Sequence, residues 1–210
     1  WRLNDCWPII YWSVVDYYLE PKIAYYYLRR AYDPVLVCFE RTPDRMAAWI
    51  VNDSPLPISG PLTVRHMTFA GKVLAERTVP VSIGPGESKR CLALDAFGPV
   101  SLREEFLQAD FAGRTVTEIL FAEKYLHLPA ATLSVERKGD SVLIGANTFV
   151  RQVVLGADGA AGPVFEDNHF DMAPGERRTV RILSTGGAKT LTVGALNAPI
   201  VSLGLGTGGR

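Results

Sequence analysis

The chain has 210 residues, of which 48% are hydrophobic, 10% aromatic and 21% charged, a balance typical of a globular protein and unlike disordered or collagen-like chains. Its 22 basic and 22 acidic residues cancel, and no basic run is present, so we expect no binding to nucleic acid or to an anionic membrane. The longest nearly apolar stretch, residues 7–15, falls short of the roughly 20 residues that cross a bilayer.

Aromatic residues are concentrated at the start of the chain. Ten of the 21 lie in the first 32 residues, including three of the four tryptophans and seven of the eight tyrosines. The composition changes near Asp33-Pro34, and because a residue before proline disfavours helical geometry, we predict a boundary there. The chain opens at Trp1 with no initiator methionine, so we expect a fragment of a longer protein.

The first predicted element is a short amphipathic helix over residues 22–32. Pro21 fits its opening turn, and Tyr25, Leu28 and Tyr32 form an i, i+3, i+7 stripe that would pack on another element. Glu20, just before the proline, is placed favourably for the helix dipole.

After Pro34 the hydrophobic period changes to two, which predicts β-strands separated by turns. The stretch 98–113 has no clear period and is left unassigned. A second round of strands follows Pro129, with Gly139-Asp140 as a hairpin signal. Two rounds of short strands predict two β-sandwiches in tandem, with a frayed glycine-rich tail at 204–210. The predicted strands cover residues 35–39, 46–51, 62–69, 73–81, 87–94 and 116–122, then 132–137, 141–146, 150–155, 162–165, 177–183 and 190–196.

Groups that could carry chemistry are sparse. Three cysteines, odd in number and widely spaced, predict neither a disulfide framework nor a zinc site, and the three histidines lack metal-ligand spacing. Asp167, Asn168 and Asp171 form an oxygen-rich cluster, but the spacing of a calcium loop is missing, so local turn capping is favoured. We therefore expect no metal and no cofactor.

Two segments carry a resemblance to a known family. The first is the run from Trp1 to Pro8 (sequence WRLNDCWP), followed by Asp16-Tyr17-Tyr18 and by residues 21–26 (PKIAYY). The second is the run from Phe165 to Glu176 (sequence FEDNHFDMAPGE). Both resemble glycoside hydrolase family 2, and most closely its β-mannosidase branch.

The resemblance implies a mainly β fold in three parts. Residues 1–33 would be a strand-loop-helix remnant that ends a (β/α)8 catalytic barrel, and residues 34–128 and 129–210 would be two immunoglobulin-like β-sandwiches. Strand ends of such barrels line the active site, and a tryptophan there can stack on a sugar ring. The substrate-binding residues implied in this way are Trp1, Asn4, Asp5 and Trp7. For Trp7 and Trp12, packing between the barrel and a sandwich is the favoured alternative.

The resemblance assigns no catalytic residue to this chain. Retaining glycosidases use two carboxyl groups roughly 5 to 5.5 Å apart, and in the family both are glutamates on earlier barrel strands. We therefore expect the chain to be inactive alone and to act through the full-length enzyme on a β-mannoside or related glycan, with the upstream barrel as its partner. The alternatives are a non-catalytic carbohydrate-binding module and a structural spacer. If studied alone, residues 1–32 should fold against the first sandwich or a second copy of the chain.

Overall fold

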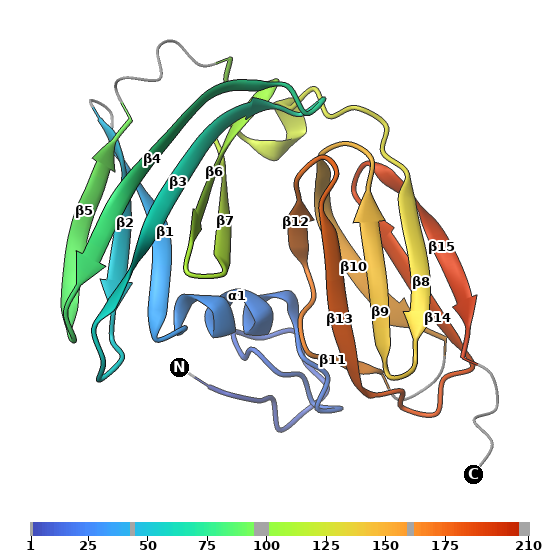
Figure 1. Cartoon of the computed structure of the whole chain (residues 1–210). Helices are drawn as coiled ribbons and strands as arrows, with labels where there is room; N and C mark the ends of the chain where they lie inside the picture. The colour runs from blue at the N-terminus through green and yellow to red at the C-terminus, as the bar shows by residue number, and fades with distance from the viewer. Residues whose placement is uncertain (1, 43–44, 95–100, 159–161, 206–210) are drawn as a thin grey trace. The chain divides into compact units, whose positions relative to one another are not determined.

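The computed structural model describes residues 2–42, 45–94, 101–158 and 162–205, and it divides into two compact units (Figure 1). One unit comprises Arg30–Leu128. The other joins Trp1–Arg29 to Pro129–Arg210, which are far apart in the sequence. Each unit has a hydrophobic core of its own, so each is described by itself.

The unit Arg30–Leu128 is a β-sandwich of two antiparallel sheets. One sheet has the strand order β1-β2-β5 and the other β4-β3-β6-β7. The strands are β1 (Val35–Arg41), β2 (Met46–Asn52), β3 (Ile58–Thr68), β4 (Val73–Ile83), β5 (Glu87–Ala93), β6 (Glu105–Phe111) and β7 (Arg114–Ile119), followed by the short 3-10 helix η2 (Glu123–Tyr125).

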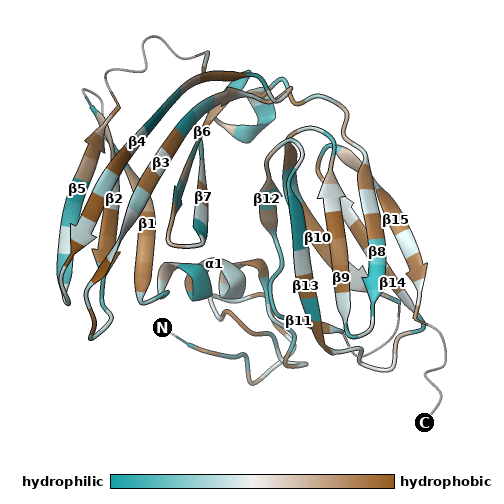
Figure 2. Cartoon of the chain, in the orientation of Figure 1, coloured by the Kyte–Doolittle hydropathy of each residue, from teal (hydrophilic) through white to brown (hydrophobic). Residues whose placement is uncertain are grey.

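Alternation of hydrophobic and polar residues drives these strands into two layers, as the bands along the ribbons in Figure 2 show. On β3, Leu62 and Val64 are buried, whereas Thr63 and Arg65, which alternate with them, are not. They join Ile50 of β2 and Phe111 of β6 in the core between the two sheets. The core is therefore made by the inward faces of both sheets.

Strand β6 was missed by the sequence pattern, because it lies in the unassigned stretch 98–113. Phe106, Leu107, Gln108 and Ala109 are four successive buried residues. The strand pairs with β3 on one side and β7 on the other, and since both of its faces are covered, no polar residue marks every second position. Residues 95–100 lie outside the described residues.

The second sandwich also consists of two antiparallel sheets, with the orders β12-β10-β14-β15 and β11-β13-β9-β8. Its core contains Ile144, Phe170, Met172 and Leu191. The strands are β8 (Leu133–Lys138), β9 (Ser141–Ala146), β10 (Val150–Ala157), β11 (Val164–Phe165), β12 (Phe170–Met172), β13 (Arg177–Ser184), β14 (Thr190–Ala195) and β15 (Ala198–Gly204). The predicted hairpin is confirmed: Lys138 pairs with Ser141, and Gly139 has the positive φ of 62° that the turn requires.

Two strands of this sandwich were not predicted. Strand β12 has three residues, too few for a period to show. Strand β15 is an edge strand whose sequence carries Pro199 and the exposed Ile200, so its pattern does not read as a buried face. Residues 206–210 of the predicted frayed tail lie outside the described residues.

The amino-terminal segment belongs to the same unit as the second sandwich. Its helix α1 (Ile23–Ala31) begins and ends one residue inside the predicted range 22–32. Residues 1–29 fold with the second sandwich and not, as expected, with the first, whereas packing against a second copy of the chain stays a prediction. The reason is that the β11–β12 region, defined as residues 162–172, supplies specific partners. The Gly162 N–H donates to Glu20, and Tyr26 is buried beside His169.

We expect the substitution Ile144→Ala to lower the free energy of unfolding by about 2–5 kcal/mol, since it removes buried methyl groups and leaves a cavity. The matched control is Ile200→Ala, because Ile200 is 72% exposed and its loss should change stability by less than about 0.5 kcal/mol. Urea unfolding followed by circular dichroism measures both. Equal effects of the two substitutions would contradict the assignment of Ile144 to the core.

Candidate functional site

The amino-terminal loop, defined as residues 5–13, is held at its base by the ammonium group of Lys22. The Nζ atom donates to Asp5 Oδ2 at 2.7 Å, to Ser13 Oγ at 2.7 Å and to the backbone carbonyl of Tyr11 at 3.3 Å. An ammonium group has three donors, and here each of them meets an oxygen. One side chain thus ties the start of the loop to its end.

Backbone bonds close the same base. Val15 forms a parallel bridge with Asn4 and an antiparallel bridge with Pro21. The Asp5 N–H donates to the Val15 carbonyl at 3.1 Å, and the Lys22 N–H donates to the Val14 carbonyl at 2.9 Å. The segment therefore has a defined fold before helix α1 begins.

Asp5 is the buried charge of this arrangement. Its side chain is 0% exposed, and the hydrogen bond from Lys22, followed by that of Ser13, holds the pKa of the carboxyl below its ordinary value. The second carboxylate oxygen, Oδ1, has no hydrogen-bond partner among the residues that the structure describes. A buried carboxylate oxygen without a donor is unfavourable, so Oδ1 has the capacity to accept a further hydrogen bond.

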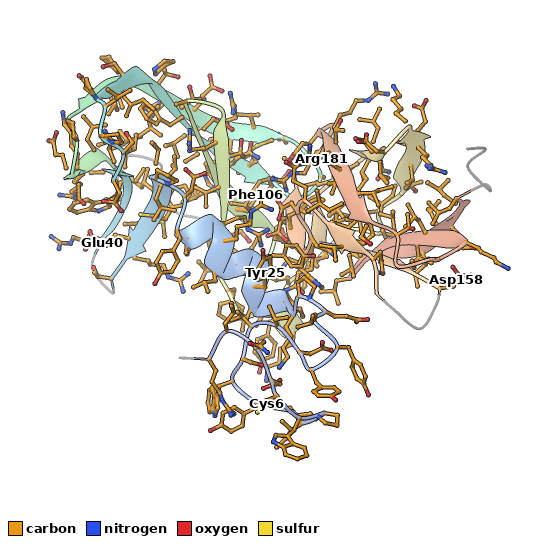
Figure 3. All side chains as sticks on the ribbon, turned by 90° about the horizontal axis from the view of Figure 1, so that it is seen from below. Cys6, Tyr25, Glu40, Phe106, Asp158 and Arg181 are labelled. Atoms are coloured by element: carbon orange, nitrogen blue, oxygen red, sulfur yellow. The ribbon has the colours of Figure 1, made fainter. Side chains whose placement is uncertain are left out.

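The outer surface of the loop is apolar. Trp7 is 73% exposed, Trp12 81%, and Ile10 fully exposed. Figure 3 shows the loop around Cys6 with aromatic rings along its edge. More than half of the exposed large hydrophobic side chains in the described residues lie between Leu3 and Tyr32. Exposed apolar side chains gathered on one segment are typical of a surface that takes part in an interaction.

The predicted site residues have different positions. Trp1 lies outside the described residues. Asn4 is exposed, and its side-chain amide donates to the Asp5 carbonyl at 3.3 Å. Asp5 lies at the base of the loop and Trp7 on its outer surface. The structure thus places Asp5 and Trp7 in the loop and Asn4 directly before it, while their contact with a substrate stays a prediction.

Three residues of this site were not identified from the sequence in the roles that they have here. Lys22 directly precedes the helix, where the helix dipole disfavours a positive charge. A lysine at such a position indicates that its ammonium group has a specific partner. Glu20 was expected to favour the dipole, but its Oε1 accepts the Gly162 N–H at 2.6 Å. Tyr26 is buried against the β11–β12 region, whereas the predicted stripe named Tyr25.

The two segments that carry the family resemblance meet in space. Residues 20–26 contact residues 162–169 of the second sandwich, although roughly 140 positions separate them in the sequence.

In the oxygen-rich cluster predicted from the sequence, Asn168 and Asp171 form hydrogen bonds within the protein. Asp171 accepts from Arg151 at 2.5 Å and from the Gln152 N–H at 2.9 Å, and Asn168 bonds both backbone groups of Leu155. Within the described ranges, no group of three His, Cys, Asp or Glu side chains could hold a metal ion. A search of the described residues finds no helix with the length and hydrophobicity of a membrane span.

Family models match both sandwiches. Residues 44–125 match a model described as "Mannosidase Ig/CBM-like domain", and residues 126–200 match one described as "Ig-fold domain". β-Mannosidase B of Aspergillus niger is 28% identical over 87% of this chain, which corresponds to 24% of that protein. The chain therefore spans about a quarter of the length of such curated relatives.

Solved structures agree. A β-D-mannosidase from Dictyoglomus thermophilum superposes with a TM-score of 0.77 at 25% identity, over 95% of this chain and 26% of that chain. The exo-chitosanase CsxA of Amycolatopsis orientalis has the same fold, with a TM-score of 0.67 at 16% identity over 96% of this chain and 30% of that chain.

These matches define the described strands as two tandem immunoglobulin-like β-sandwiches of the kind found in glycosidases. The chain belongs to glycoside hydrolase family 2, in its β-mannosidase-like branch.

We expect the loop to loosen in acid. Because the Asp5 pKa is lower in the folded chain than its ordinary 3.8, folding is favoured by this group above about pH 4, and the gain is lost as the pH falls through the folded pKa. Tryptophan fluorescence, recorded from pH 7 to pH 2, should show a transition that Asp5→Asn lacks. The control Asp140→Asn, at an exposed turn, should keep it. Coincident profiles for the wild type and Asp5→Asn would contradict this role for Asp5.

Proposed function

We propose that this chain is the C-terminal part of a retaining exo-glycosidase that hydrolyses terminal β-D-mannosides. In this proposal residues 1–33 complete the catalytic barrel, and the sandwiches 34–128 and 129–210 support it. The catalytic carboxyl pair comes from the barrel upstream, so this chain contributes no catalytic residue.

The observation that carries the proposal is the exposed apolar surface of an otherwise ordered segment. The loop is fixed by the Lys22 contacts, yet Trp7, Ile10 and Trp12 are turned to solvent. The occupant that fits is the barrel of the same polypeptide, because the relatives are about four times as long as the part that this chain matches. Burial of these side chains would offset the entropy of ordering the loop against its neighbour.

Within that barrel, we assign two kinds of role to the amino-terminal residues. Trp1 and Trp7 offer flat apolar faces to a sugar ring or to the barrel wall, and Asn4 offers an exposed amide to a hydroxyl group. Asp5 has a positioning role, since Lys22 occupies one of its oxygens and the side chain is shielded from solvent. All of these roles concern substrate binding, and none of these residues is proposed as a nucleophile.

A carbohydrate-binding module receives less support from the described residues. Such a module would present a row of rings on one sheet face. Trp49 is half-buried on β2, where its Nε1–H donates to Glu40 at 3.0 Å, and Tyr125 lies on η2 beside Arg103 and Lys124. These two rings belong to different elements and form no row.

The proposal is tested with a panel of aryl β-glycosides, offered to this 210-residue chain and to the full-length enzyme that contains it. We expect the full-length enzyme to cleave the β-mannoside and this chain to cleave none, because the carboxyl pair lies upstream. Failure of the full-length enzyme on every glycoside would overturn the proposal, as would activity of the chain alone.

A variant in the full-length enzyme tests the loop. Trp7→Ala should lower kcat/KM for the β-mannoside by about tenfold or more, equivalent to the loss of roughly 1.4 kcal/mol of aromatic contact. Tyr125→Ala, which removes an exposed ring of the first sandwich, is the control and should leave kcat/KM unchanged. An unchanged value for Trp7→Ala would show that this ring contacts neither sugar nor barrel.

A further inference from the structure

Tyr26 joins helix α1 to the second sandwich. Its side chain is buried, and its hydroxyl group hydrogen-bonds with the backbone of Phe165 and with the Asn168 side chain. Its ring centroid lies 5.8 Å from that of His169. Burial raises the pKa of Tyr26, so the hydroxyl is present as a neutral group that can both donate and accept. Its neighbours Tyr27 and Leu28 are exposed, so the helix contacts the second sandwich through the side that carries Tyr26.

Glu20 makes a second contact with the same domain. Its Oε1 accepts the Gly162 N–H at 2.6 Å, a charge-assisted bond. A Cβ atom at position 162 would lie 2.4 Å from the Glu20 carboxyl carbon, so any side chain there displaces the carboxylate. Glycine at 162 and glutamate at 20 are thus fitted to each other.

The receiving segment is itself fixed to strand β10. Asn168 is buried; its Oδ1 accepts from the Leu155 N–H at 2.9 Å, and its Nδ2 donates to the Leu155 carbonyl at 2.8 Å. The guanidinium of Arg178 lies 4.1 Å from the Phe170 ring centroid on the following strand, β12. Because the Asn168 bonds reach β10, a central strand of its sheet, they fix the backbone that contacts Tyr26.

Both contacts flank the residue that holds the loop. Glu20 lies two positions before Lys22, and Tyr26 lies four positions after it, one helical turn away. Anything that fixes Glu20 and Tyr26 therefore fixes the Lys22 backbone, and through the Lys22 ammonium it fixes Asp5 and Ser13.

We infer that Glu20 and Tyr26 are positioning residues through which the second sandwich holds the amino-terminal loop in place. The inference rests on the proposed function for its catalytic consequence: a wall of the sugar site is oriented by a domain that contributes no residue to that site. The second sandwich is then required for activity, and its removal acts through the loop.

Amide hydrogen exchange of the 210-residue chain tests the positioning itself. The reporters are the hydrogen-bonded backbone amides of Asp5, Val15 and Lys22. Tyr26→Phe removes the hydroxyl bonds and should speed their exchange about tenfold, while amides of β2 in the first sandwich stay unchanged. Tyr18→Phe, at a ring that is 69% exposed, is the matched control and should leave all of them unchanged.

Gly162→Ala provides an independent variant at the other contact. It should speed exchange at the same three amides, since the added methyl group displaces Glu20. If neither Tyr26→Phe nor Gly162→Ala changes exchange at these amides, the inference is overturned. Faster exchange in both variants, with β2 unaffected, supports it.

Kinetics of the full-length enzyme test the catalytic consequence. Well below the unfolding temperature, Tyr26→Phe should lower kcat/KM for the β-mannoside about tenfold, mainly through KM, whereas Tyr125→Phe, at an exposed ring of the first sandwich, should not. A purely structural role would lower Tm and leave KM unchanged, which would overturn the catalytic part. If the wild-type enzyme cleaves no β-mannoside while the exchange result holds, the proposed function fails and the positioning by the second sandwich stands.

Discussion

The ammonium group of Lys22 is the contact on which the amino-terminal segment depends. It bonds both ends of the loop, through Asp5 at one end and Ser13 and Tyr11 at the other. A buried carboxylate is costly unless it is paired, so the pair commits the loop to one arrangement. The closed base fixes the ends of the loop from which the exposed Trp7 and Trp12 project.

The anchoring of that segment gives the second sandwich a role beyond its own core. Its β11–β12 region receives Tyr26 and Glu20, which come from the opposite end of the chain. The contacts that join Trp1–Arg29 to Pro129–Arg210 form only after a long loop has closed, whereas the core of the second sandwich lies within one stretch. The first sandwich is likewise formed from one continuous stretch, Arg30–Leu128.

The apolar surface of the loop connects the fold to the family. Members such as the β-mannosidase of Dictyoglomus thermophilum are about four times as long as the part matched here. In the proposed full-length enzyme, burial of Trp7, Ile10 and Trp12 would remove apolar surface from water and so lower the free energy. The sandwiches, whose own cores are complete, need no such cover.

The sequence by itself determined the class of fold and most of its strands. Period-two alternation located β1 to β5, and the Gly139-Asp140 turn located the β8–β9 hairpin, since these signals are local. It could not locate β6, which is buried on both faces, or the edge strand β15. The family resemblance marked residues 1–8 and 165–176, but only the tertiary structure decided that these ends share one unit. The physical reason is that the partners of Lys22, Glu20 and Tyr26 are specific oxygen and N–H groups, which become neighbours only when the chain has folded.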